Sequence, residues 1–154
     1  MIQRIQSVFL LLLALCCIAL LFLPIWTKTD PATGQTLELT AFNLTQPDGT
    51  GSSSTIAIAI LAIIAAAVAI FEIFQYKSRL TQMKLGMLNT LLLAGLLGAI
   101  MYYAYYVGDE MMPSVEGERE AGFYLPFLAL LLNAMANRFI RRDEQLVRSV
   151  DRLR

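Results

Sequence analysis

The stretch IAIAILAIIAAAVAIFEIF, residues 56–74, decides the fold class. It holds one charged residue, Glu72, and is apolar around its whole circumference rather than along one stripe. A helix of that kind belongs in a bilayer or in a large buried core. A bilayer is crossed by about 20 apolar helical residues. Because a chain of 154 residues cannot build a soluble core around several such helices, the stretch predicts a membrane span.

Three other apolar stretches are long enough for a span, and they cover Val8–Ile25, Leu85–Val107 and Phe123–Ile140. Composition agrees, because 57% of the residues are hydrophobic and only 16% are charged, whereas a typical soluble domain is about 25% charged. We therefore expect an all-α membrane protein that forms one domain, residues 1–154, built as a four-transmembrane-helix bundle. The expected spans are 8–25, 56–74, 85–107 and 123–140, the outer loops are 27–55 and 108–122, and the tail is 141–154.

The first apolar stretch has Arg4 before it, as a signal peptide would. It is longer than the usual apolar region of a signal peptide, and no small-residue cleavage site follows it. We expect it to remain as an uncleaved membrane anchor.

The inventory of reactive side chains excludes several classes of function. The chain has no His, which is the commonest general base and catalytic metal ligand. The two cysteines, Cys16 and Cys17, are adjacent and lie in apolar sequence, so they build no disulfide framework. A net charge of zero gives no reason to expect nucleic acid as a partner. With no catalytic motif present, we expect no enzymatic activity, no cofactor and no metal.

Positive charge is distributed unevenly between the segments that connect the spans. Of the 12 Lys and Arg residues, only Lys28 and Arg119 lie in the two outer loops. Because Lys and Arg are enriched in cytoplasmic segments, both termini are expected in the cytoplasm, with the spans in the inner membrane. Aromatic residues that favour membrane interfaces fall at the predicted outer side of this arrangement: Trp26, Tyr102, Tyr103, Tyr105, Tyr106 and Tyr124.

The two outer loops carry different signals. In the first loop, TDPATGQ (residues 29–35) is a turn signal, and QTLELTAF (35–42) alternates polar and apolar residues as a strand does. This pattern predicts a small β-hairpin, with DGTGSSST (48–55) as a flexible return. The second outer loop is acidic, but it lacks the spacing of a calcium loop, so we expect a solvated segment.

Polar residues within the spans gather at one depth. The candidate polar cluster consists of Glu72, Asn89, Thr90, Asn133, Asn137 and Arg141. Counted from the nearest basic residues, its members lie in the cytoplasmic third of three helices, and Gln6 brings the first helix to the same level. Two interpretations stay open. The cluster can be a structural hydrogen-bond network between helices, with Glu72 paired to a nearby basic side chain, or a small polar pocket open to the cytoplasm.

Small residues are the main packing signal. Ala94 and Gly98 form a small-xxx-small pair with Gly95 beside them, and residues 56–74 contain seven alanines. Small residues let helix backbones approach closely. The pattern predicts either a tight bundle or an interface with another subunit, and it does not distinguish the two.

The end of the chain is expected to be a helix that leaves the membrane. After Pro126 no helix breaker occurs, and a helix from 123 to 154 exceeds the ~30 Å hydrocarbon core at ~1.5 Å per residue. Leu146, Val150 and Leu153 form a narrow apolar stripe, which makes them a candidate partner-binding tail. The tail can also lie on the headgroups or pack under the bundle.

The two ends of the chain, MIQRIQSVFLLLLA (1–14) and ANRFIRRDEQLVRSVDRLR (136–154), resemble a family of short membrane proteins from Bacteroidetes. That family is known as domain of unknown function 4293. The resemblance implies an integral inner-membrane protein and implies no activity, catalytic residue or cofactor.

Three functions remain in competition. The favoured one is an accessory or scaffolding subunit of a membrane complex, with the lipid bilayer and other subunits, or further copies of the chain, as partners. The alternative is a small homo-oligomeric transporter or channel with a cytoplasmic-side polar pocket. A lipid-modifying enzyme is the least supported, because no catalytic motif is present.

Overall fold

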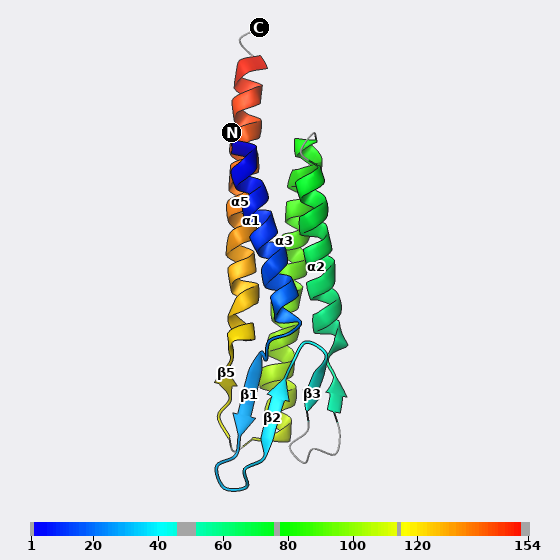
Figure 1. Cartoon of the computed structure of the whole chain (residues 1–154), viewed down its shortest axis with the longest axis vertical. Coiled ribbons are helices and arrows are strands. Elements are labelled where there is room, and N and C mark those ends of the chain that lie inside the picture. The colour runs from blue at the N-terminus through cyan, green and yellow to red at the C-terminus, as the bar shows by residue number, and fades with distance from the viewer. Residues whose placement is uncertain (1, 46–51, 76–77, 114, 152–154) are drawn as a thin grey trace.

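In the computed structural model, residues 2–45, 52–75, 78–113 and 115–151 are described, and the side chains of 2–4 and 147–151 lie outside that description. Four long helical segments run side by side, and a small sheet covers one end of them (Figure 1). The helices are α1 (Ile2–Leu20), α2 (Ile56–Phe74), α3 (Arg79–Met101) and α5 (Ala121–Asp151). Helix α1 packs on α2 and α5, and α3 packs on the same two, so α1 and α3 lie diagonally opposite.

Among the described residues, three helices are long and apolar enough to cross a membrane. They cover Ile56–Phe74, Arg79–Met111 and Ala121–Leu146. The second is longer than expected, because α3 continues through a π-helical turn, η1 (Tyr102–Val107), into α4 (Gly108–Met111). The third is part of α5 and confirms that the C-terminal helix continues past residue 140, and α5 is described as far as Asp151.

The first apolar segment differs from the expectation that it reaches Ile25. Helix α1 ends at Leu20, and its apolar part, Ile5–Leu20, is shorter than the other three. Pro24 has no backbone N–H and disfavours helical dihedrals in the residue before it. Beyond this proline, the Ile25 N–H donates to Leu39 O at 2.8 Å, so the chain has already joined the sheet.

The prediction of an all-α protein is wrong in one respect, because five short strands form an antiparallel sheet of order β4-β3-β2-β1-β5. The strands are β1 (Trp26–Thr29), β2 (Thr36–Leu39), β3 (Asn43–Thr45), β4 (Ser52–Ser54) and β5 (Glu118–Arg119). The expected hairpin is confirmed as β1–β2, but the sheet extends beyond it on both sides. Strand β5 comes from the acidic loop between α4 and α5, so that loop is not only a solvated connection.

The β1–β2 turn follows directly from its sequence. The Asp30 carboxylate accepts hydrogen bonds from the Ala32 N–H at 2.8 Å and the Thr33 hydroxyl at 2.7 Å. These bonds hold the pKa of Asp30 below its usual value, because they stabilise the ionised form. Gly34 adopts φ 70°, which an L side chain disfavours. The stretch from 29 to 35 thus supplies both a side-chain acceptor and a permissive backbone, as the turn signal predicts.

Two side chains of β1 anchor the sheet to the helices. Trp26 was expected at a membrane interface. It is instead fully buried, so its ring is packed inside the protein. Lys28 is 2% exposed, and its Nζ lies 2.5 Å from Asp109 Oδ1 and donates to Met112 O at 2.9 Å. These contacts tie β1 to the end of the long helix that α3 and α4 form.

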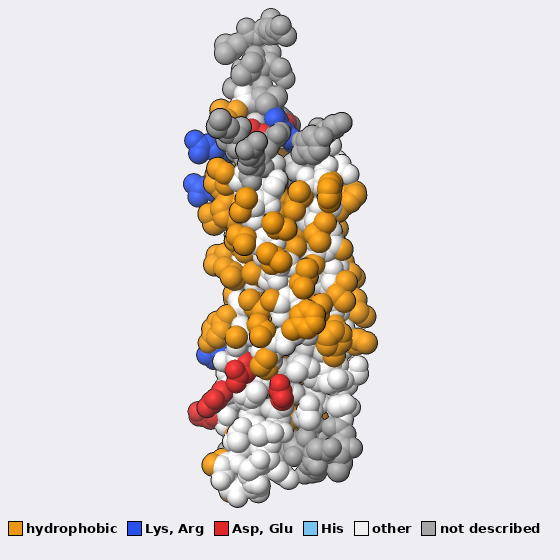
Figure 2. All heavy atoms as spheres, viewed as in Figure 1, with side chains coloured by type: hydrophobic (Ala, Val, Ile, Leu, Met, Phe, Trp, Pro, Cys, Tyr) orange, Lys and Arg blue, Asp and Glu red, His pale blue; other side chains and the backbone are white. Residues whose placement is uncertain are grey.

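The surface divides into three zones (Figure 2). A broad band of hydrophobic side chains covers the middle of the helices on the face shown, and all four long helices carry exposed large hydrophobic residues. Acidic side chains gather near the sheet, whereas Lys and Arg side chains gather at the opposite end of the band, where α5 projects beyond its neighbours. An apolar band of this kind, exposed on every helix, suits a lipid environment rather than water.

Candidate functional site

A layer of buried polar side chains crosses the bundle at the end opposite the sheet. Its members are described as buried on all four helices: Gln6 on α1, Glu72 on α2, Gln82 and Asn89 on α3, and Asn133 on α5. Helices α2 and α3 are joined by a short connection near this layer, so Glu72 and Gln82 are brought together. The Gln82 Nε2 donates to the backbone oxygen of Glu72 at 3.0 Å.

Helices α3 and α5 meet in this layer at Gly86. The Asn133 Nδ2 donates to Gly86 O at 3.1 Å and to the Thr90 hydroxyl at 2.8 Å. Thr90 in turn donates to Gly86 O at 2.9 Å. Asn137 covers the glycine itself, because a Cβ at position 86 would lie 1.9 Å from Asn137 Oδ1. The absence of a side chain at Gly86 therefore lets α5 bring two asparagines against the α3 backbone.

Several polar atoms in the layer have no hydrogen-bond partner among the described residues. They are both Glu72 carboxylate oxygens, both amide atoms of Asn89, Asn133 Oδ1 and Gln6 Oε1. Of the basic residues expected to pair with Glu72, Arg79 instead binds Asp143 at 3.1 Å. The Arg4 side chain and Lys77 lie outside the described residues. Since an unpaired buried polar group is costly, the layer is suited to hold water, a proton or a small polar ligand.

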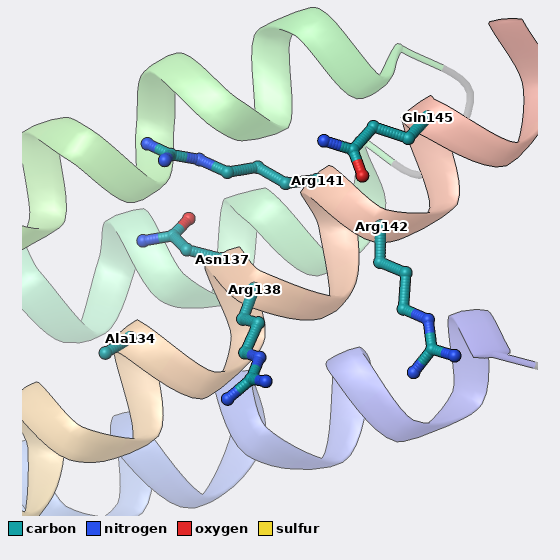
Figure 3. A pocket seen from close by; sticks show the side chains of 6 residues that line it. All are labelled: Ala134, Asn137, Arg138, Arg141, Arg142 and Gln145. Atoms are coloured by element: carbon teal, nitrogen blue, oxygen red, sulfur yellow. The ribbon is translucent and has the colours of Figure 1, made fainter.

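The residues of the candidate polar cluster fall into two places. Glu72, Asn89 and Asn133 lie in the buried layer, and Thr90 lies at its edge in contact with Asn133. Asn137 and Arg141 instead line a surface hollow of about 630 Å³ along α5, with Ala134, Arg138, Arg142 and Gln145 (Figure 3). A functional role for either group of residues stays a prediction.

Gln82 is a member of the buried polar layer that was not predicted from the sequence. It lies seven residues before Asn89, and the buried residues of α3 include Gln82, Gly86, Asn89, Leu93 and Leu96. This spacing places all five on one helix face. The spacing of Gln82 from Gly86 and Asn89 is therefore the sequence signal that predicts its burial.

The candidate partner-binding tail is described only in part. Leu146 is half exposed. The side chain of Val150 and all of Leu153 lie outside the described residues. The partner-binding role of this stripe stays a prediction.

The described residues give no sign of a metal centre, because they contain no group of three or more His, Cys, Asp or Glu side chains placed to hold an ion. Cys16 and Cys17 are free cysteines on α1. The buried polar layer itself consists of four amide side chains and one carboxylate, that of Glu72.

The apolar helices and the hydrophobic band define this chain as a helical membrane protein with a small sheet at one end. It belongs to the family described as domain of unknown function (DUF4293), whose model matches residues 2–153. The chain matches none of the curated proteins and none of the solved structures with which it was compared.

Proposed function

We propose that this protein is an accessory subunit of an inner-membrane complex, and that it associates through the outward face of α3. The observation that carries the proposal is the position of its small residues. Ala94, Gly95 and Gly98 are exposed, and a Cβ added at Gly95 or Gly98 would have no heavy atom within 4 Å. The lack of a side chain at Gly95 and Gly98 is therefore not needed for close packing within the described part of the chain.

The alanines of α2 differ from the small residues of α3 in their burial. Five of the seven are buried between helices: Ala59, Ala62, Ala65, Ala66 and Ala69. The bundle thus uses most of the alanines of α2 for its own packing, whereas Ala94, Gly95 and Gly98 of α3 are left exposed. In lipid, small residues on an outward face favour close approach of another helix, because van der Waals packing drives helix association there.

The proposed orientation places both termini and the polar layer on the cytoplasmic side, with the sheet outside and α1 as a fourth span. Its support is the separation of charge seen in Figure 2, since Lys and Arg favour cytoplasmic segments. In this orientation α5 projects into the cytoplasm, where its tail is available to soluble or membrane partners.

The double variant Ala94→Ile/Gly98→Ile tests the proposed face. Branched side chains there would hold a partner helix away, so we expect partner recovery to fall about tenfold, the equivalent of ~1.4 kcal/mol. The protomer should stay folded, because the space around Gly98 is open. The measurement is quantitative mass spectrometry of proteins that co-purify with the full chain from native membranes.

The matched control is Ala57→Ile/Ala67→Ile, which changes two exposed small residues of α2 in the same way. This control should retain the partner. Recovery of the wild-type chain alone, without a stoichiometric partner, would contradict the proposal.

A second candidate function is a small homo-oligomeric transporter or channel with a polar pocket on the cytoplasmic side. The observation that favours it is the buried Glu72 carboxylate, which has no hydrogen-bond partner among the described residues and lies in the same layer as Asn89. Buried carboxylates in membranes often mark ion or proton pathways. Flux through liposomes that contain only this protein, abolished by Glu72→Gln, would favour this function over the accessory role.

A further inference from the structure

Three arginines within five residues of α5 form the wall of a surface hollow. Arg138, Arg141 and Arg142 line it together with Asn137 and Gln145, and Ala134 lies at one end (Figure 3). Arg138 and Arg142 are four residues apart and extend to the same side of α5, whereas Asn137, Arg141 and Gln145 form the neighbouring row. Two rows of N–H donors therefore border one hollow of about 630 Å³.

The positive charge of this hollow is not neutralised by the ion pairs that the described residues form. Those pairs join Lys28 to Asp109 and Arg79 to Asp143, so they involve none of the three arginines. Glu144 lines a smaller neighbouring hollow with Met83 and shares Arg141 with the larger one. Among the described residues, the lining of the larger hollow thus combines three guanidinium groups with two amides and includes no carboxylate. Its chemistry favours an anion with several acceptor oxygens.

The position of the hollow along α5 restricts the kind of anion. Arg138 is the first charged residue after the apolar part of the helix, and Phe127 and Leu131 lie exposed on the apolar side of it. Leu131 is 64% exposed, and it precedes Arg138 by two helical turns, or about 10 Å. A molecule with a phosphate at one end and a long apolar chain at the other therefore fits along this face.

We infer that the hollow binds the phosphate group of an anionic phospholipid, with an acyl chain along Phe127 and Leu131. Arg138 and Arg142 approach the phosphate oxygens from one side, and Arg141 and Gln145 donate from the adjacent row. Arginine suits this task because its fork of N–H groups matches two phosphate oxygens at once. Basic pockets at the cytoplasmic side of membrane helices are known to hold anionic headgroups in this way.

The test is native mass spectrometry of the full chain, released from mixed micelles that contain phosphatidylglycerol or phosphatidylcholine. The variant Arg138→Gln/Arg142→Gln should retain about tenfold less phosphatidylglycerol than the wild type, while retention of phosphatidylcholine stays equal. Arg138→Lys/Arg142→Lys keeps the charge and loses the paired N–H groups. Its retention of phosphatidylglycerol should therefore fall between that of the wild type and that of Arg138→Gln/Arg142→Gln. Lys84→Gln/Arg119→Gln removes the same charge at two described, exposed residues outside the lining of the hollow and should retain phosphatidylglycerol as the wild type does.

A separate arm distinguishes the source of the phosphate. Millimolar inorganic phosphate should fail to displace phosphatidylglycerol, because it lacks the acyl chain. Displacement by inorganic phosphate would assign the hollow to a soluble phosphate compound and overturn the lipid site. Equal loss of phosphatidylglycerol in the Lys84→Gln/Arg119→Gln control would also overturn it, since net charge would then explain the effect. Thermal unfolding of each variant establishes that all are folded.

Discussion

Replacing Trp26 with alanine is expected to lower the free energy of unfolding by about 3–5 kcal/mol, the range for truncating a large buried aromatic residue. The Trp26 ring is fully buried between Gly108 and Gly117. A Cβ at Gly117 would lie 2.3 Å from Trp26 Cε2, and one at Gly108 would lie 2.5 Å from Trp26 Cη2. The ring therefore fills the space that both glycines leave open, and its loss would leave a cavity where the sheet meets the helices.

Thermal unfolding of the full chain in detergent measures this effect. Phe22→Ala is the matched control, because Phe22 lies just beyond α1 but is 81% exposed. We also expect proteolysis between residues 27 and 45 to become faster in Trp26→Ala, since β1 pairs with both β2 and β5. If Trp26→Ala and Phe22→Ala unfolded at the same temperature, the anchoring role of the tryptophan would be wrong.

Replacing Gly86 with alanine is expected to destabilise the contact between α3 and α5 by about 1–3 kcal/mol through overpacking. The new Cβ would overlap Asn137 Oδ1, and moving α5 away would stretch the hydrogen bond from Asn133 to Gly86 O. Because the overlapping group is a side chain, Asn137→Ala should relieve the strain. The double variant should therefore be more stable than the sum of the two single changes predicts, with a coupling of about 0.5–3 kcal/mol.

Gly98→Ala is the control for the glycine series. It adds the same methyl group to the same helix in open space, and alanine favours a helix by about 1 kcal/mol over glycine. Thermal unfolding should therefore show no loss of stability for Gly98→Ala. Strictly additive effects of Gly86→Ala and Asn137→Ala would show that the two residues do not compete for the same space.

The apolar helices could be predicted from the sequence because length and composition alone determine them. The stretch from 56 to 74 coincides with α2 at both ends. Helix α1 was predicted too long because the apolar run continues past Leu20, although Pro24 ends the helical conformation there. Apolar composition alone does not distinguish a membrane helix from the buried beginning of a strand. Ile25 and Trp26 are apolar and buried, but Trp26 begins β1 and Ile25 directly precedes it.

The sheet was predicted only where its sequence alternates. Strand β2, with Leu37 and Leu39 buried, carries that pattern. Strand β5 has two residues, both charged, and it forms because β1 lies beside it rather than through its own preference. The pairing of Lys28 with Asp109 crosses 81 positions of sequence, and no local pattern signals it.

The polar layer was predicted in part because intramembrane polar residues are rare enough to recognise. The depth of Glu72, Asn89 and Asn133 follows from counting along each helix. Which side chains face inward depends on how the helices are rotated, and this separates Asn133 from the exposed Arg141 on the same helix. The same rotation decides that the alanines of α2 pack inside while Gly98 faces out, a choice that the sequence alone left open.

The most direct test of the central claim places a photoreactive amino acid at Leu91 on the outward face of α3 and, separately, at Leu131 on α5. These side chains are 71% and 64% exposed, so both positions report on the surroundings of the bundle. After irradiation of native membranes, the account predicts that Leu91 gives an adduct with one protein, lost in Ala94→Ile/Gly98→Ile, and that Leu131 gives lipid adducts. Lipid adducts alone from both positions would contradict it.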